Sequence, residues 1–387
     1  VGSTSPSDAI AKRIADTRAH FDPADELLAD VGHAGTGSPH ASHHVFVNLP
    51  DPHPTTVHER FTGVPRCATR FAGRPARPAL PGGRATRRCA HAVARHRCVG
   101  GVLGRAGVDL RIGPGAGDRM QREGLVHAGI KLRFGGADHR IDFGGLTGGR
   151  GITVYGQQGL GKDLIALRVG AGHPILFEVG DVRLHGIDTE QPSITFLLDG
   201  ATTSIECDVI AGCDGFHGVS RGSIPDGVLT TYEREYPFAW LGILANVAPS
   251  SEELIYCYNE RGFALLTMRS RTVSRLYLQV AADERIDDWS DVRIWGELQA
   301  RLAAADWSLA EGPITEKGVS AMRSFVVEPM QFGRLFLSGD AAHIVPPTGA
   351  KGMNLALRDV SILAEAPTAF YANGDTGLLG QYSANFL

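Results

Sequence analysis

The chain contains 387 residues, of which 38 are lysine or arginine and 42 are aspartate or glutamate. This length predicts about two structural units, and 43% hydrophobic with 21% charged residues excludes a disordered or collagen-like protein. The net charge of −4 gives no global reason to bind nucleic acid or an anionic membrane. The best apolar run, residues 238–245, is far shorter than the roughly 20 residues of a membrane-spanning helix, so we expect no membrane partner.

The first residues and the cysteines together indicate a cytoplasmic protein. Residues 1–6 lack the basic and apolar regions of a secretory signal. The six cysteines form no CxxC pair and are sparse for a disulfide scaffold, so a reducing, cytoplasmic location is expected.

The first hundred residues differ in composition from the rest of the chain. Residues 60–108 contain eleven arginines and no acidic residue. Metal or nucleic-acid binding is disfavoured there, because Cys89 and Cys98 lack the spacing of a zinc finger and the arginines have no aromatic interleaving. A solvated linker fits the prolines and glycines of residues 75–83, and a shifted reading frame fits the dominance of Arg, Ala, Pro and Gly. We expect residues 1–100 to be atypical, either disordered or out of frame, with no metal site.

From residue 101 onward the sequence has the pattern of an α/β protein. Residues 193–198 and 203–207 are typical of two strands, and the Asp-Gly pair at 199–200 between them is typical of a tight hairpin turn.

Two further short apolar segments, residues 208–212 and 334–338, are predicted to be buried strands. Each is followed by an aspartate, Asp214 and Asp340, and open α/β sheets bind their ligands at such strand ends. Apolar residues at helical spacing predict a helix that begins near Gly352, whose N-terminus favours anionic groups. The alternative is a proline-containing turn in which the aspartate only caps the helix.

The length of the motif at residues 339–354 allows a more specific interpretation. It reads GDAAHIVPPTGAKGMN, and residues 213–221 read CDGFHGVSR. Together they resemble the class A FAD-dependent aromatic hydroxylases, and the similarity to their 4-hydroxybenzoate 3-monooxygenase group extends over about residues 101–382. The resemblance implies an α/β fold with a Rossmann-like FAD-binding domain, an inserted mixed α+β substrate domain, and incomplete ends. It assigns residues 101–126, 152–234 and 324–373 to the FAD-binding domain, 127–151 and 235–323 to the substrate domain, and 374–387 to the start of a truncated C-terminal region.

The resemblance also implies FAD as cofactor and NAD(P)H as co-substrate. Asp340 would hold the ribityl chain of FAD, and the loop before the predicted helix would surround the isoalloxazine edge. His217 and Arg323 match positions that the family uses for NADPH. The implied cofactor contacts are Gln157, Asp214, Gly215, Asp340, Gly349, Gly352, Met353 and Asn354.

For the substrate, the resemblance implies a small aromatic acid that reacts with O2. Arg269 would pair its guanidinium with the benzoate carboxylate, and Tyr256 would bind the phenolic oxygen and help it ionise. Taken singly, Arg269 could be a surface ion pair and Tyr256 a core tyrosine. The other implied residues are Thr267 and Tyr277, which add hydroxyl groups, Arg275 between flavin and substrate, Pro347 with its carbonyl near the phenol, and His127 as a proton outlet.

The expected reaction is hydroxylation of 4-hydroxybenzoate to 3,4-dihydroxybenzoate with NAD(P)H and O2, and a homodimer is compatible with the family. Two departures leave alternatives open. The chain has no Gly-x-Gly-x-x-Gly loop for the FAD pyrophosphate, and it stops at Leu387, where family members continue. The alternatives are a non-catalytic or inactive remnant of such an enzyme and a hydroxylase of another hydroxybenzoate.

Overall fold

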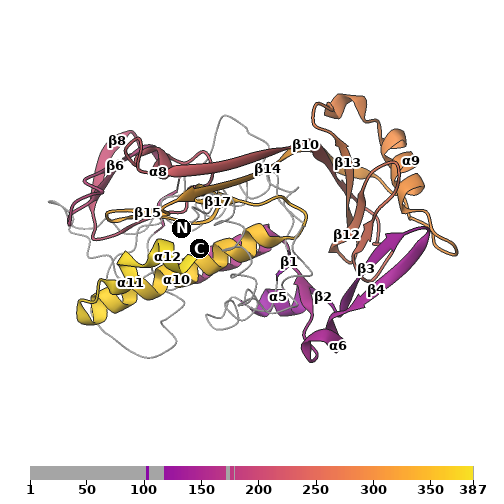
Figure 1. Ribbon diagram of the computed structural model, residues 1–387, viewed down its shortest axis with the longest axis horizontal. Helices are drawn as coiled ribbons and strands as arrows, with labels where there is room; N and C mark the ends of the chain where they lie inside the picture. The colour runs from indigo at the N-terminus through magenta and orange to yellow at the C-terminus, as the bar shows by residue number, and fades with distance from the viewer. Residues whose placement is uncertain (1–101, 104–116, 171–174, 178, 387) are drawn as a thin grey trace, which may run out of the picture.

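The computed structural model describes residues 102–103, 117–170, 175–177 and 179–386 of the chain. Its two ends are bridged by long strands, β10 (Thr230–Ala245) and β14 (Ile314–Glu328), which pair in antiparallel fashion (Figure 1). The predictions for residues 1–100 lie outside the described residues, as does the segment where a pyrophosphate loop was sought.

An eight-stranded sheet dominates one end of the molecule. Its strand order is β17-β14-β10-β13-β12-β11-β3-β4, and all neighbours are antiparallel except β11 and β3. The remaining strands of this sheet are β3 (Gly129–Phe134), β4 (Ala137–Asp142), β11 (Ile255–Cys257), β12 (Ala264–Ser270), β13 (Val273–Ala281) and β17 (His343–Ile344).

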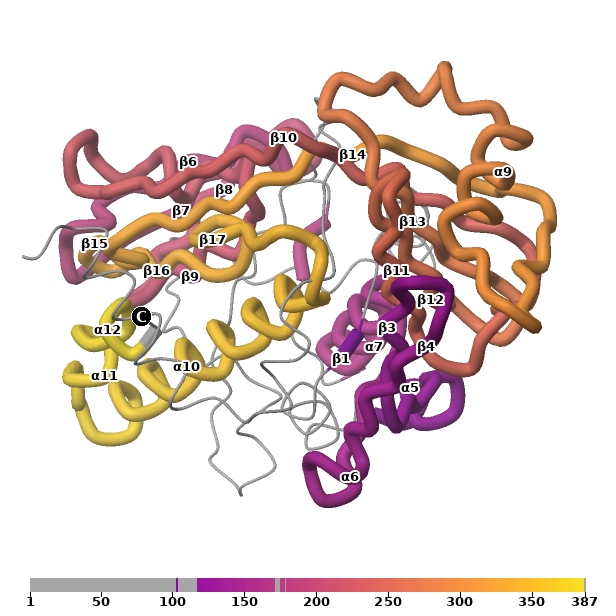
Figure 2. Tube along the Cα trace, turned by 45° about the vertical axis from the view of Figure 1, so that its right-hand side comes forward, coloured from indigo at the N-terminus to yellow at the C-terminus, as the bar shows by residue number. Residues whose placement is uncertain are grey.

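The two faces of this sheet have different roles, because successive side chains of a strand alternate between faces. One face packs on helix α9 (Asp291–Leu302), which lies on the side of β12 and β13 away from α10 (Lys351–Asn373) (Figure 2). The buried residues of that layer include Leu241, Ile243, Ile255, Leu266, Leu276, Leu278, Ile294 and Leu298. The other face is therefore left for the interior of the molecule.

Three smaller sheets form the rest of the described β-structure. Their strand orders are β1-β5-β2, β15-β16-β9 and β6-β7-β8. The predicted hairpin is confirmed in the third, where Asp199 and Gly200 have φ of 50° and 79°, the positive values that such a turn requires. The strands are β1 (Val102–Leu103), β2 (Leu125–His127), β5 (Ile152–Val154), β6 (Gly180–His185), β7 (Ser193–Leu198), β8 (Ala201–Glu206), β9 (Ile210–Gly212), β15 (Gln331–Phe332) and β16 (Leu335–Leu337).

The two predicted buried strands lie next to each other. β9 and β16 pair in parallel, with Ile210 opposite Leu335 and Gly212 opposite Leu337. Because they are parallel, their carboxyl ends meet at one edge and place the loops that follow side by side. The predicted helix is α10, which begins at Lys351, one residue before the expected start, after Ala350 in the left-handed conformation (φ 51°).

The other helices are short apart from α7 and α9. They are α5 (Asp118–Glu123), α6 (Phe143–Thr147), α7 (Gln157–Gly170), α8 (Val219–Gly222), α11 (Gly377–Gly380) and α12 (Tyr382–Phe386), with 3₁₀ turns η2 (Ile286–Asp288) and η3 (Gly339–Ala341). Among the described residues, no helix combines the length and hydropathy that a membrane span requires. The domain boundaries expected from the sequence stay predictions.

Candidate functional site

Four of the predicted substrate residues share one face of the eight-stranded sheet. Thr267 on β12 is directly opposite Arg275 on β13, and Leu265 is opposite both Tyr277 and, on its other side, Tyr256. Directly paired residues in neighbouring strands point to the same side of a sheet. This face lies opposite the α9 layer, so the fold gathers side chains that are separated along the chain.

An aromatic cluster continues this face and was missed by the sequence analysis. The ring of Trp240 lies 4.9 Å from that of Tyr277 and 5.4 Å from that of Phe263, and Tyr256 lies 6.2 Å from Phe263. Trp240 is 2% exposed. The alternation within β10, in which Ala239 and Leu241 face α9, was the available signal that Trp240 faces the site. Such a wall suits the flat, apolar faces of an aromatic ring.

The guanidinium groups of Arg275 and Arg269 lie near the same face of the sheet. Arg275 is 6% exposed, and its Cζ lies 5.0 Å from the centre of the Tyr277 ring. Burial lowers the pKa of Arg269, and the neighbouring charge of Arg275 lowers it further. In the described part of the chain, Arg269 forms no ion pair with a carboxylate but donates through Nη2 to Oε1 of Gln158. A pair of like charges withdrawn from water favours the arrival of an anion.

His127, the predicted proton outlet, ends strand β2 and is 3% exposed. Neither of its ring nitrogens has a hydrogen-bond partner among the described residues. Burial lowers its pKa to about 4, against a smaller opposing effect of Glu253. The imidazole is therefore neutral near pH 7, with one nitrogen able to accept a proton and the other able to donate one.

The lowered pKa of His127 predicts a pH-dependent stability. The folded pKa of about 4 lies below the ordinary value of 6.5, so the unfolded chain binds more protons between these values and stability falls as pH drops through this window. Between pH 7 and 4.5, the wild type should lose about 2.5 kcal/mol more unfolding free energy than His127→Gln. Urea unfolding at both pH values measures this difference. His139→Gln, at an exposed histidine, is the control and should behave like the wild type.

The loops after β9 and β16 carry the predicted Asp-Gly and Gly-Asp motifs. Asp214 accepts the backbone N–H of Ser220 in α8 through Oδ2 at 2.9 Å, while its buried Oδ1 has no partner among the described residues. Gly215 and Gly339 have φ of 76° and 62°, which favour glycine at both turns. Asp340 is exposed in η3, so its carboxylate can accept hydrogen bonds from the hydroxyl groups of a ligand.

The remaining predicted cofactor residues surround the start of helices α10 and α7. Pro347, Gly349 and Met353 are buried beside the N-terminus of α10, where no side chain caps the helix. A Cβ at Gly352 would meet nothing within 4 Å, so there is open space at this turn. Asn354 donates through Nδ2 to the carbonyls of Val102 and Ala350, both at 2.9 Å, and Gln157 is the first residue of α7.

A buried acid–histidine pair behind the Asp340 loop was not anticipated. Asp359 of α10 is fully buried, and its Oδ2 accepts the backbone N–H of Gly339 at 2.6 Å and lies 2.8 Å from Nε2 of His343. The signal was available in the sequence, because Asp359 follows Ala356 and precedes Leu363 at helical spacing on the apolar side of α10.

The two residues expected to contact NADPH lie around one aromatic ring. The Cζ of Arg323 is 3.8 Å from the centre of the Phe216 ring, and the exposed His217 meets that ring edge-on at 5.0 Å. Arg323 also forms an ion pair of 3.6 Å with Glu233. The structure therefore brings His217 and Arg323 together, next to the loop that follows β9.

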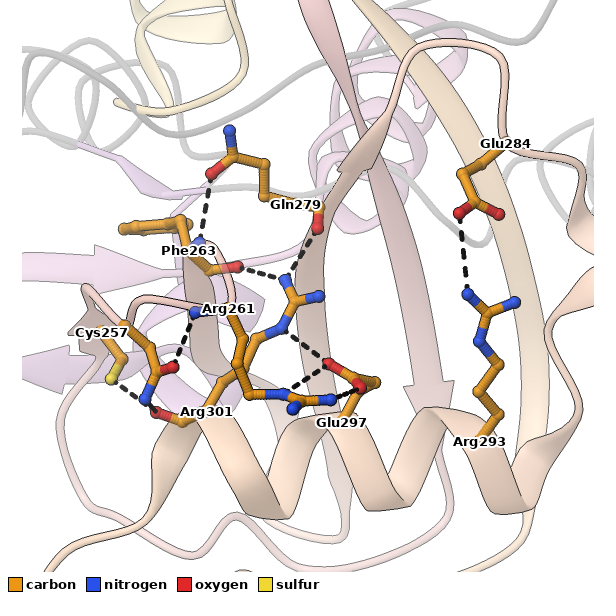
Figure 3. Close-up of polar contacts among 9 residues, drawn as sticks. Cys257, Arg261, Phe263, Gln279, Glu284, Arg293, Glu297 and Arg301 are labelled. Carbon is orange, nitrogen blue, oxygen red and sulfur yellow. Dashed lines mark hydrogen bonds and ion pairs between the residues drawn. The ribbon is translucent and has the colours of Figure 1, made fainter.

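A cavity of about 670 Å³ at the outer end of the large sheet contains none of the predicted site residues. Its polar groups satisfy one another, because Glu297 accepts from both Arg261 and Arg301 (Figure 3). Arg301 also donates to the carbonyl of Gln279 at 2.7 Å, and Arg293 pairs with Glu284. This network stabilises the junction of α9 with β12 and β13.

The described residues fit the flavin end of FAD. The uncapped N-terminus of α10 offers backbone N–H groups, Asp340 offers an exposed carboxylate, and the buried Oδ1 of Asp214 lacks a partner among the described residues. Contact between Arg269 and Gln158, the neighbour of Gln157, joins this cofactor end to the substrate face of the sheet.

Comparisons with known proteins agree with this geometry. A family model described as an FAD binding domain matches residues 100–386. The p-hydroxybenzoate hydroxylase of Acinetobacter baylyi is 47% identical over 292 residues, which cover 75% of this chain and 72% of that protein.

Two solved structures show that the fold is shared. The p-nitrophenol 4-monooxygenase of Pseudomonas putida matches with a TM-score of 0.60 at 16% identity, over 74% of this chain and 73% of that one. Aklavinone-11 hydroxylase, in a ternary complex with FAD and aklavinone, matches with a TM-score of 0.59 at 20% identity, over 73% of this chain and 57% of that one. The chain therefore belongs to the flavoprotein aromatic monooxygenases with this FAD binding domain, the family that includes p-hydroxybenzoate hydroxylase.

Proposed function

We propose that this protein hydroxylates 4-hydroxybenzoate to 3,4-dihydroxybenzoate, using FAD, NAD(P)H and O2. The observation that carries the proposal is the pair of neighbouring arginines, the half-buried Arg269 and the buried Arg275, at the end of a face lined by aromatic rings. A site with this charge and this wall suits a small, flat acid better than a neutral or extended molecule. The 47% identity to p-hydroxybenzoate hydroxylase supports the same substrate class.

Each substrate residue has a role that its position allows. Arg269 binds the carboxylate, and Thr267 and Tyr277 donate hydroxyl hydrogen bonds from the same sheet face. Tyr256, half-buried on β11, orients the phenolic oxygen at the other end of the ring and stabilises its ionised form. A phenolate is more electron-rich than a phenol, so the ring carbon beside it becomes the preferred point of attack.

Proton removal from the phenol needs a group that works near neutral pH. His127 would relay this proton and not hold it, because its pKa of about 4 keeps the imidazole neutral near pH 7, with one nitrogen able to accept a proton as the other releases one. Pro347 is buried in the loop before α10, and its backbone carbonyl would accept a hydrogen bond from the phenolic hydroxyl. Arg275, on the substrate face of the sheet, would contact both the flavin and the substrate.

The cofactor would be held by Asp340 and Asp214 at the strand ends and by the backbone of residues 349–354. When bound, FAD supplies the redox chemistry, accepting hydride from NAD(P)H and activating O2. His217 and Arg323 provide a cationic, aromatic surface for the pyridine nucleotide beside Phe216. The cytoplasmic location and a homodimer stay predictions.

The test compares the three hydroxybenzoate isomers with purified protein supplied with FAD. We expect a flavin spectrum that changes on addition of 4-hydroxybenzoate, and NAD(P)H oxidation matched by formation of 3,4-dihydroxybenzoate. Faster turnover of the 2- or 3-hydroxy isomer would show that the protein is a hydroxylase of another hydroxybenzoate. Colourless protein that binds no added FAD would instead identify an inactive relative.

A further inference from the structure

We propose that Gln158 is a positioning residue that holds Arg269 in place for the substrate carboxylate, and that its neutral amide makes the site selective for anions. Gln158 was not among the residues expected from the sequence, although Gln157 next to it was. The inference rests on the proposed function, because it concerns how the same site recognises an aromatic acid.

The contact joins two distant parts of the chain. Gln158 lies in the first turn of α7 and accepts through Oε1 from Nη2 of Arg269, which comes from β12. Gly156 makes this approach possible, since a Cβ at that position would overlap the Arg269 guanidinium. The arginine therefore rests on the turn between β5 and α7 rather than extending freely from its strand.

The first turn of α7 is itself firmly anchored. Arg119 of α5 donates to the Tyr155 hydroxyl at 3.0 Å and to the carbonyl of Gly159 at 2.8 Å, and it forms an ion pair of 2.6 Å with Asp163. The Tyr155 hydroxyl donates to Asp163 at 2.8 Å. These contacts fix α7 on both sides of Gln158, so the amide that receives Arg269 has a defined position.

The charge at position 158 decides what Arg269 can bind. A neutral amide accepts a hydrogen bond without cancelling the positive charge, whereas a glutamate there would form a permanent ion pair of the stronger, charge-assisted kind. Arg275 adds a second positive charge next to Arg269. An incoming benzoate carboxylate is thus drawn to a guanidinium that is oriented but not neutralised.

The experiment measures dissociation constants by calorimetry for two ligands of the same shape, anionic 4-hydroxybenzoate and neutral 4-hydroxybenzamide. The proteins are the wild type, Gln158→Glu and Gln158→Ala. The control is Gln121→Glu, which adds the same charge at an exposed residue of α5. Thermal melting of each variant reports whether the fold is intact.

We expect Gln158→Glu to weaken the binding of 4-hydroxybenzoate on the order of tenfold or more. The dissociation constant of 4-hydroxybenzamide should stay within about twofold of the wild-type value. Gln158→Ala should weaken the binding of 4-hydroxybenzoate by about threefold to tenfold, since Arg269 regains rotamer freedom that binding must remove. Gln121→Glu should bind both ligands like the wild type. The selective loss of the anion is a result that a merely structural role would not produce.

Two results would overturn the inference in different ways. If the wild type binds 4-hydroxybenzoate and Gln158→Glu binds it equally well, Gln158 does not govern the charge of the site, and the proposed function stands. If the wild type binds neither ligand, the proposed function fails and the inference fails with it.

Discussion

Replacement of Arg269 by alanine is expected to weaken 4-hydroxybenzoate binding by about a hundredfold or more, because a guanidinium that is half-buried and becomes enclosed when it pairs with a carboxylate contributes roughly 2–5 kcal/mol. Arg275 would remain but lies on the neighbouring strand, with its guanidinium against the Tyr277 ring. Arg269→Lys should recover only part of the loss, since an ammonium cannot form the two parallel hydrogen bonds of the planar guanidinium. Titration calorimetry and kcat/KM measure the effect.

The matched control for this change is Arg271→Ala. Arg271 follows the same strand but is exposed in the turn before β13. It should leave the dissociation constant unchanged to within about twofold, because exposed charges contribute little. Full turnover by Arg269→Ala, with an unchanged KM, would show that the carboxylate is bound elsewhere.

Replacement of Asp359 by alanine is expected to lower the free energy of unfolding by roughly 3 kcal/mol or more, since it removes the acceptor that two buried polar groups share. The backbone N–H of Gly339 loses its acceptor at 2.6 Å, and His343 loses its partner at 2.8 Å. Because Gly339 begins the turn that presents Asp340, FAD affinity should fall as well. Urea unfolding measures the first effect and flavin fluorescence the second.

Asp340→Ala separates stability from cofactor binding. Asp340 lies next to the same turn, but it is exposed, so its removal should change the unfolding free energy by no more than about 0.5 kcal/mol. The loss of the Asp340 carboxylate should still lower the affinity for FAD. If Asp359→Ala unfolds at the same urea concentration as Asp340→Ala, the buried pair does not stabilise this loop.

The sequence predicted those parts of the fold that depend on local pattern. The hairpin around Asp199 and Gly200 and the start of α10 near Gly352 follow from turn chemistry and helical periodicity, and both are confirmed. The buried strands before Asp214 and Asp340 were also predicted from their short apolar runs, and the structure shows that they pair in parallel. Their ends could then be placed at a binding site.

Other parts depend on contacts between distant segments, and no local pattern encodes them. The parallel pairing of β3 with β11 joins Lys131 to Ile255 and completes the large sheet, yet each strand alone is short and unremarkable in sequence. The contact of Gln158 with Arg269 likewise requires α7 to approach β12. The resemblance to a known family supplied residues for the site, whereas Gln158 emerged only from the packed structure. Trp240 and Asp359 were also missed, although strand alternation and helical spacing indicated where they face.

The two long strands that bridge the molecule also determine how it comes apart. β14 contributes Phe325 and Val327 to the core behind the strand-end loops, and Met322 to the aromatic cluster of the substrate face. Its partner β10 contributes Leu241 and Trp240 to the layers at the other end. Melting either core removes paired backbone from the other, so we expect the cofactor and substrate ends to unfold in a single cooperative transition. A destabilised variant that loses one site should then lose the other with it.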